Sequence, residues 1–132
     1  MGLLVDTSVF VAFERGQTGP AFDSDEQVAL CSVTASELLH GVHRADASQR
    51  REKRRAFVES ILARFEVLPI DLPTARIHAQ LWADLRSQGQ SIGAHDLLIA
   101  ATAVHHELRI LTANVRDFAR VPGLMVESFG TR

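Results

Sequence analysis

Short apolar runs alternate with longer amphipathic segments along the chain, and this alternation constrains the fold more than any other feature of the sequence. The apolar runs predict strands at residues 2–6, 28–32, 66–71, 109–114 and 124–127. The segments between them predict helices at 7–15, from Ser32 or Thr34 through Val42, and at 48–65, 73–88, 93–109 and 115–120. Because parallel neighbours need helical crossovers, we expect an α/β fold, with a mostly parallel sheet of four to five strands and helices on both faces.

The size and composition of the chain suit one globular domain. Its 132 residues are 46% hydrophobic and 23% charged, so we expect a single domain over residues 1–132 with a real core. The first segment has no basic leader, and Asp6 interrupts its apolar run, so it resembles neither a signal peptide nor a membrane span. We therefore expect a cytoplasmic protein with no membrane association.

Polar residues follow the predicted strands where a parallel sheet would gather them. Asp6 ends the first strand, Glu37 lies one helical turn beyond the second, and Asn114 ends the fourth, with Asp117 one turn later. Asp96 falls in the first turn of the most apolar helix. Ligands in open sheets of this kind bind beyond the carboxyl ends of the strands, so we expect these side chains to line one site.

Each acid taken singly also has an ordinary structural explanation. Asp6 could accept backbone hydrogen bonds in a turn, and Glu37 could close a capping box with Thr34. Three carboxylates gathered together would repel one another, however, and raise one another's pKa unless a cation relieved them. Hard oxygen ligands suit Mg²⁺, with Mn²⁺ as a possible substitute, and such ions activate water for attack on phosphodiesters.

Four motifs in order resemble the PIN-domain nucleases, and most closely the VapC-type toxins of bacterial toxin-antitoxin pairs. The motifs are Leu-Leu-Val-Asp6-Thr-Ser-Val, Ser-Val-Thr-Ala-Ser-Glu37-Leu, Ile-Gly-Ala-His-Asp96-Leu-Leu-Ile-Ala-Ala and Leu-Thr112-Ala-Asn114-Val-Arg-Asp117-Phe. The resemblance spans the whole chain. It implies a PIN-like fold and a metal-dependent endoribonuclease that cleaves RNA, with Asp6, Glu37 and Asp96 as metal ligands and Ser8 and Thr112 as supporting hydroxyls.

The same resemblance implies a fourth catalytic position and two protein partners. Many relatives place an aspartate directly after the fourth strand, where this chain has Asn114, with Asp117 three residues on. Either residue could complete the site, and the choice between one metal and two stays open. VapC-type toxins are silenced by a VapB-type antitoxin and usually form homodimers, for which the Phe10 to Phe13 and Leu81 to Leu85 faces are candidate partner surfaces.

A basic run contrasts with the formal net charge of −2. Residues 44–55 contain six basic and two acidic side chains, most simply explained as a solvated helix face. The alternative is that Arg50, Arg51 and Arg54 guide RNA toward the acids, in which case their replacement should flatten the salt dependence of binding.

Three other functions each match part of the pattern, but two of them lack a residue that they need. A phosphoaspartate phosphatase would need a second aspartate at position 8, where this chain has Ser8. The pairs His40 with His43 and His105 with His106 lack the third ligand that zinc needs. A catalytically weak PIN-like module whose acidic pocket binds a basic peptide stays open, because Asn114 is a weaker ligand than aspartate. A metal titration separates that module from the nuclease.

Overall fold

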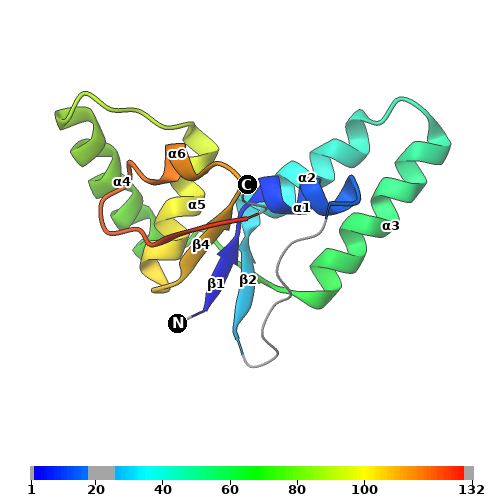
Figure 1. Cartoon of the computed structure of the whole chain (residues 1–132), viewed down its shortest axis with the longest axis horizontal. Coiled ribbons are helices and arrows are strands. Elements are labelled where there is room, and N and C mark those ends of the chain that lie inside the picture. Colours follow the sequence, from blue (N-terminus) through cyan, green and yellow to red (C-terminus); the bar gives the residue numbers. More distant parts are fainter. Residues whose placement is uncertain (1, 18–25, 130–132) are drawn as a thin grey trace.

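The fold is built on one parallel sheet. The computed structural model describes residues 2–17 and 26–129, which form a five-stranded sheet of order β3-β2-β1-β4-β5 (Figure 1). The strands are β1 (Leu3–Val5), β2 (Val28–Cys31), β3 (Glu66–Leu68), β4 (Arg109–Thr112) and β5 (Val126–Ser128). Every pairing is parallel, with Leu4 of β1 opposite Ala29 on one side and Ile110 on the other. The predicted parallel α/β sheet is confirmed.

Helices cover both faces of the sheet. Helices α1 (Thr7–Glu14), α2 (Ser32–Arg44) and α3 (Ser48–Arg64) lie on one side, and α4 (Leu72–Ser87), α5 (Ala94–His105) and α6 (Val115–Phe118) lie on the other (Figure 1). Successive strand residues point to opposite layers, so Leu3 and Val5 pack beneath α1 to α3 whereas Leu4 packs beneath α4 and α5. Each layer thus has its own apolar cluster, and β1 contributes to both.

Helix α5 is the most deeply buried helix, as its apolar sequence predicts. Ile99, Ala100, Ala101 and Ala103 are all fully buried, and the small side chains let α5 lie close to the sheet and to α4. The helix ends at His105, four residues before the predicted end at Arg109. Glu107 adopts a left-handed conformation with φ 56°, and Leu108 N–H donates to the Ala103 carbonyl at 2.9 Å. Glu107 N–H also donates to the Val104 carbonyl at 3.2 Å, and the two bonds form a Schellman cap, which frees Arg109 to begin β4.

All five strands differ from the predicted ranges by at least one residue, and β4 ends at Thr112 rather than at Asn114. Strand β3 ends at Leu68 rather than residue 71, because Asp71 instead accepts a 3.0 Å bond from Thr74 N–H and caps α4. Strand β5 spans Val126–Ser128, shifted from the predicted 124–127. Most of the loop predicted at residues 16–26 lies outside the described residues.

The candidate partner faces are mostly core. Phe10, Leu81 and Leu85 are buried, so these three side chains pack in the core and do not form a partner surface. Trp82 does not extend the buried stripe of α4, because its side chain is 52% exposed and lies beside His78, with ring centroids 5.6 Å apart. Among the described helices, none combines the length and the apolar character that crossing a membrane requires.

The role of α5 can be tested by truncating one core side chain. Ile99 is 0% exposed, so Ile99→Ala should leave a cavity and lower the free energy of unfolding by about 3 kcal/mol in urea denaturation. The matched control is Leu72→Ala on α4, where the side chain is 63% exposed and the loss should stay below about 0.5 kcal/mol. Equal losses at the two positions would contradict the central place of α5.

Candidate active site

The predicted acids meet at the carboxyl ends of the strands. Asp6 follows β1 directly, Glu37 lies on the helix that follows β2, and Asp96 lies in the first turn of α5. They line one cavity of about 420 Å³. Its complete lining is Asp6, Thr7, Ser8, Val11, Ala12, Arg15, Gln17, Glu37, Asp96, Ala113 and Asn114. The cavity therefore brings together residues that lie up to 108 positions apart in the sequence, from Asp6 to Asn114.

Asp6 is held rigidly at the bottom of this cavity. Its carboxylate is the N-cap of α1 and only 2% exposed. Its Oδ2 atom accepts hydrogen bonds from Ser8 Oγ at 2.7 Å and from Thr112 Oγ1 at 2.9 Å. Each hydroxyl in turn accepts a backbone N–H, from Ala113 at 3.0 Å and from Asn114 at 2.8 Å. Because these amides occupy lone pairs of the hydroxyls, the hydroxyl protons are directed at Asp6.

Glu37 serves the cavity and not its own helix. The N-cap of α2 is Cys31, whose Sγ accepts from Val33 N–H at 3.4 Å, so the alternative explanation of Glu37 by a capping box with Thr34 is wrong. Glu37 instead accepts a 2.5 Å bond from Thr7 Oγ1 on α1. Its second carboxylate oxygen lies 3.2 Å from His95 Nδ1 on α5. Glu37 thus joins three helices at the rim of the site.

The pKa of Asp96 is raised by its partly buried place in the acidic cluster. Partial burial first, and then the negative charges of Asp6, Glu37 and Asp117 in that order, together raise the pKa of its carboxyl to about 6. His95 opposes the shift. A carboxyl that titrates near neutrality beside other acids marks a place where negative charge is concentrated, which is typical of functional sites.

The two candidates for the fourth position occupy different places. Asn114 lines the cavity and is the N-cap residue just before α6, with an exposed side chain that makes no capping bond. Asp117 lies outside the lining, with its Oδ1 atom 3.6 Å from Arg120 Nη1. Its charge still reaches Asp96. Asn114 is therefore the nearer of the two residues to the cavity, and Asp117 acts at its edge.

Three cavity neighbours were not predicted from the sequence. Thr7 and His95 both contact Glu37, and Arg15 lines the cavity from the end of α1. Thr7 and His95 each stand beside a predicted acid, so their positions in the Asp6 and Asp96 motifs were a usable signal. Arg15 had no such signal, because it reaches the site only through the direction in which α1 runs.

The predicted RNA-binding residues lie on α3, around a second cavity. Arg50 and Arg54 line it, and each is paired, Arg50 with Asp46 at 2.6 Å and Arg54 with Glu14 at 2.8 Å. Arg51 is outside the lining and donates to the Ala45 carbonyl at 2.7 Å.

A family model described as "PIN domain" matches residues 3–124 of the chain. The chain belongs to the PIN-domain family. Ribonuclease VapC1 of Rickettsia felis is 39% identical over 127 residues, which cover 96% of this chain and 95% of the relative. Ribonuclease VapC5 of Mycobacterium tuberculosis is 38% identical over 91% of this chain and 87% of its own length. The sequence resemblance to this family is thereby confirmed.

Solved structures of PIN-domain proteins share the fold. A member of the VapBC family of toxin-antitoxin systems from Mycobacterium tuberculosis superposes with a TM-score of 0.78 at 38% identity, over 96% of this chain and 95% of that one. DNA-bound VapBC from Salmonella typhimurium gives a TM-score of 0.85 at 27% identity, over 97% and 98%. The arrangement of strands and helices is thus that of PIN-domain toxins.

The acids of this PIN domain surround the cavity without converging on a point. In residues 2–17 and 26–129, no group of three carboxylate, imidazole or thiolate side chains has the arrangement that would hold a metal ion as it stands. Asp6 is drawn toward Ser8 and Thr112, and Glu37 toward Thr7 and His95. Local hydrogen bonds therefore fix each carboxylate separately.

Removing the charge of Asp96 should stabilise the protein in the absence of metal. Because the pKa of Asp96 is raised from 3.8 to about 6 on folding, ionisation costs stability in full above pH 6, progressively less between 6 and 4, and nothing below. Asp96→Asn should raise stability near neutral pH by about 1 kcal/mol, or roughly 3–5 °C in melting temperature, after allowance for partial exposure. Thermal denaturation in chelator from pH 8 to pH 4 measures the effect, which should vanish at the acid end.

Asp71→Asn is the control for that experiment. Hydrogen bonds from Thr74 lower the pKa of Asp71, so the loss of this charge should destabilise the protein at neutral pH, the opposite sign. A melting temperature of Asp96→Asn that is unchanged or lowered at neutral pH would show that the cluster is not repulsive.

Proposed function

We propose that this protein is a metal-dependent endoribonuclease that hydrolyses phosphodiester bonds in RNA. The observation that carries the proposal is the gathering of Asp6, Glu37 and Asp96, from three separate segments, around one cavity at the carboxyl edge of the sheet. The names of the relatives support RNA as the substrate, since they are described as ribonucleases and, in Salmonella typhimurium, as a tRNA(fMet)-specific endonuclease.

The chemistry of the donors fits a divalent cation. The three proposed ligands, Asp6, Glu37 and Asp96, offer hard carboxylate oxygens. The pKa of Asp96 is raised first by burial and then by repulsion from the neighbouring acids, and a bound cation would relieve that repulsion. We infer Mg²⁺ as the ion, with Mn²⁺ as a substitute. When bound, such an ion lowers the pKa of water and offsets charge on the phosphate.

The remaining residues of the cavity position these carboxylates. Ser8 and Thr112 hold Asp6 in one orientation by two short hydrogen bonds. Thr7 and His95 do the same for Glu37 from opposite sides. Arg15, at the end of α1, supplies a positive charge at the rim that suits an incoming phosphate. Asn114 offers an amide oxygen as a weak fourth donor, and Asp117 acts from the edge.

We infer that the protein works in the cytoplasm as the toxin of a toxin-antitoxin pair. The support is the description of the solved relatives from Mycobacterium tuberculosis and Salmonella typhimurium as VapBC assemblies. A VapB-type antitoxin is the inhibitory partner we propose. We also propose a homodimer, for which the 52% exposed Trp82 on α4 offers an apolar contact.

A basic-peptide pocket is the second candidate function. It is favoured by the lack, in the described residues, of three ligand side chains already arranged to hold an ion. Calorimetric titration with Mg²⁺ or Mn²⁺ distinguishes the two, because the nuclease requires saturable binding that Asp96→Asn weakens.

Removal of one proposed ligand tests the nuclease directly. Asp6→Asn should reduce Mg²⁺-dependent cleavage of RNA on the order of 1,000-fold while circular dichroism stays unchanged, because one ligand and its charge are lost. Chelator should abolish cleavage by the unsubstituted protein. Glu59→Gln, an equal charge change on the exposed face of α3, should keep full activity. Full activity of Asp6→Asn would refute the site.

The edge position of Asp117 leads to a graded expectation. Asp117→Asn should cost roughly three- to tenfold in single-turnover cleavage, far less than Asp6→Asn, because Asp117 lies outside the cavity and acts only through its charge. Equal losses for the two variants would show that Asp117 contacts the ion directly.

A further inference from the structure

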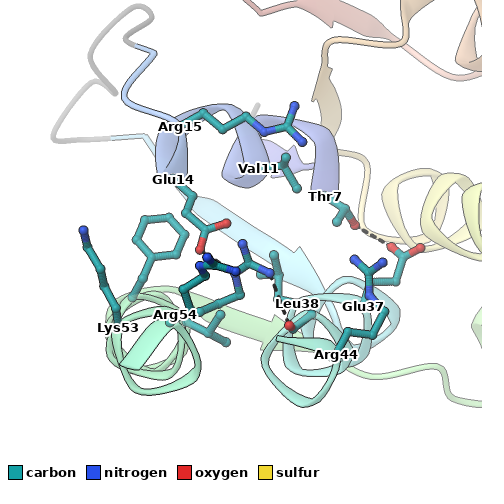
Figure 2. Close-up of a pocket in the computed structure, with 13 residues that line it drawn as sticks. Thr7, Val11, Glu14, Arg15, Glu37, Leu38, Arg44, Lys53 and Arg54 are labelled. Carbon is teal, nitrogen blue, oxygen red and sulfur yellow. Dashed lines mark hydrogen bonds and ion pairs between the residues drawn. The ribbon is translucent and has the colours of Figure 1, made fainter. Parts of the chain in front are cut away.

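A second cavity of about 430 Å³ lies between α1, α2 and α3, beside the acidic one. Figure 2 shows α1 on one wall and α2 with α3 on the other, with Arg15 projecting from α1 and Lys53 from α3. We call this cavity the basic groove. It is lined by Thr7, Val11, Glu14, Arg15, Glu37, Leu38, Gly41, Arg44, Arg50, Lys53, Arg54, Phe57 and Val58.

The basic groove is continuous with the acidic cavity. The two share Thr7, Val11, Arg15 and Glu37 in their linings. The hydrogen bond from Thr7 to Glu37, which Figure 2 shows, joins two of these shared residues. A chain-like ligand that enters the acidic cavity can therefore continue into the groove without leaving the surface.

The charges of the groove divide into paired and unpaired cations. Five basic side chains line it, against the two acids Glu14 and Glu37. Arg54 is bonded to Glu14 at 2.8 Å and to the Gly41 carbonyl at 3.3 Å, and Arg50 is paired with Asp46. Within residues 2–17 and 26–129, Arg15, Arg44 and Lys53 make no ion pair. These three cations remain available to a ligand.

The other walls of the groove are apolar. Val11, Leu38, Phe57 and Val58 contribute side chains between the cations. Unpaired cations beside apolar surface suit single-stranded RNA, which exposes phosphates together with the faces of its bases and riboses. A duplex would keep its base faces stacked inside and offer no base face to the apolar walls. An acidic peptide would satisfy the cations, but it would not connect them to a site where phosphodiesters are cut.

We propose that the basic groove binds the single-stranded RNA that flanks the scissile bond, with its phosphates contacted by Arg15, Arg44 and Lys53. This inference rests on the proposed function, because it assigns the path of that substrate. Arg50, Arg51 and Arg54 already bond to other residues of this chain. The proposal therefore moves the RNA contacts from these three arginines to Arg15, Arg44 and Lys53. Arg15 is the link, since it lines both cavities.

Binding can be measured apart from cleavage. The probe is a labelled single-stranded RNA of about 12 nucleotides, followed by fluorescence anisotropy in chelator at several salt concentrations, with every protein carrying Asp96→Asn to prevent cutting. Adding R44Q and K53Q should weaken binding roughly tenfold and reduce the slope of log affinity against log salt by about 1.4, at about 0.7 per lost phosphate contact. Each single variant should give about half of that change.

The matched control removes two exposed cations from the opposite layer. Arg76 and Arg86 lie on α4, and R76Q with R86Q makes the same change in net charge. This control should keep the parental affinity and slope. A groove variant with the same slope as the control would overturn the proposal. The proposal would also be overturned if the groove variant lost as much affinity for duplex RNA as for single-stranded RNA. It would likewise be overturned if the groove substitutions weakened the binding of an acidic peptide and left the salt slope for RNA unchanged.

Failure of the groove and failure of the proposed function give different results. If the unsubstituted protein cleaves RNA with Mg²⁺ while R44Q with K53Q leaves the slope unchanged, only the groove assignment is wrong. If no cleavage occurs but the slope falls as expected, the nuclease is wrong and the groove stands as an RNA-binding site.

Discussion

The hydrogen bonds that Ser8 and Thr112 donate to Asp6 are the contact on which the rest of the site depends. They join the end of β1, the start of α1 and the end of β4 at one carboxylate oxygen. Because that carboxylate also caps α1, the direction of the helix is fixed relative to the sheet. The direction of α1 in turn determines where Thr7 meets Glu37 and where Arg15 enters both cavities.

The acidic cavity lowers the stability of the folded protein, and the packing of the core offsets this loss. Asp96 stands partly buried beside other negative charges, and both the burial and the repulsion raise the pKa of its carboxyl. It is carried on α5, whose following turns place the fully buried Ile99, Ala100, Ala101 and Ala103 in the core beside the sheet and α4. A helix anchored so firmly can hold a destabilising carboxylate in place, which a surface loop could not.

The sequence predicts those features that arise from short-range patterns, and it misses those that depend on long-range contacts. Alternating apolar runs revealed the parallel sheet, the end of the first strand revealed Asp6, and the first turn of the most apolar helix revealed Asp96. The end of α5 was misplaced because Glu107 takes the left-handed position that glycine usually marks. Glu37 fitted a capping box locally, yet its partners Thr7 and His95 are 30 and 58 residues away.

The acidic cavity and the basic groove lie on two sides of α1, and each suits a different part of an RNA substrate. Acids on one side suit a cation that offsets charge at the bond to be cut, and bases on the other suit the phosphates beyond it. The two sets would cancel if they mixed freely. The ion pair between Glu14 and Arg54 and the hydrogen bond from Thr7 to Glu37 occupy the acids that face the groove. Arg15, Arg44 and Lys53 are thereby left without protein partners in the described part of the chain, and their positive charge stays available for RNA.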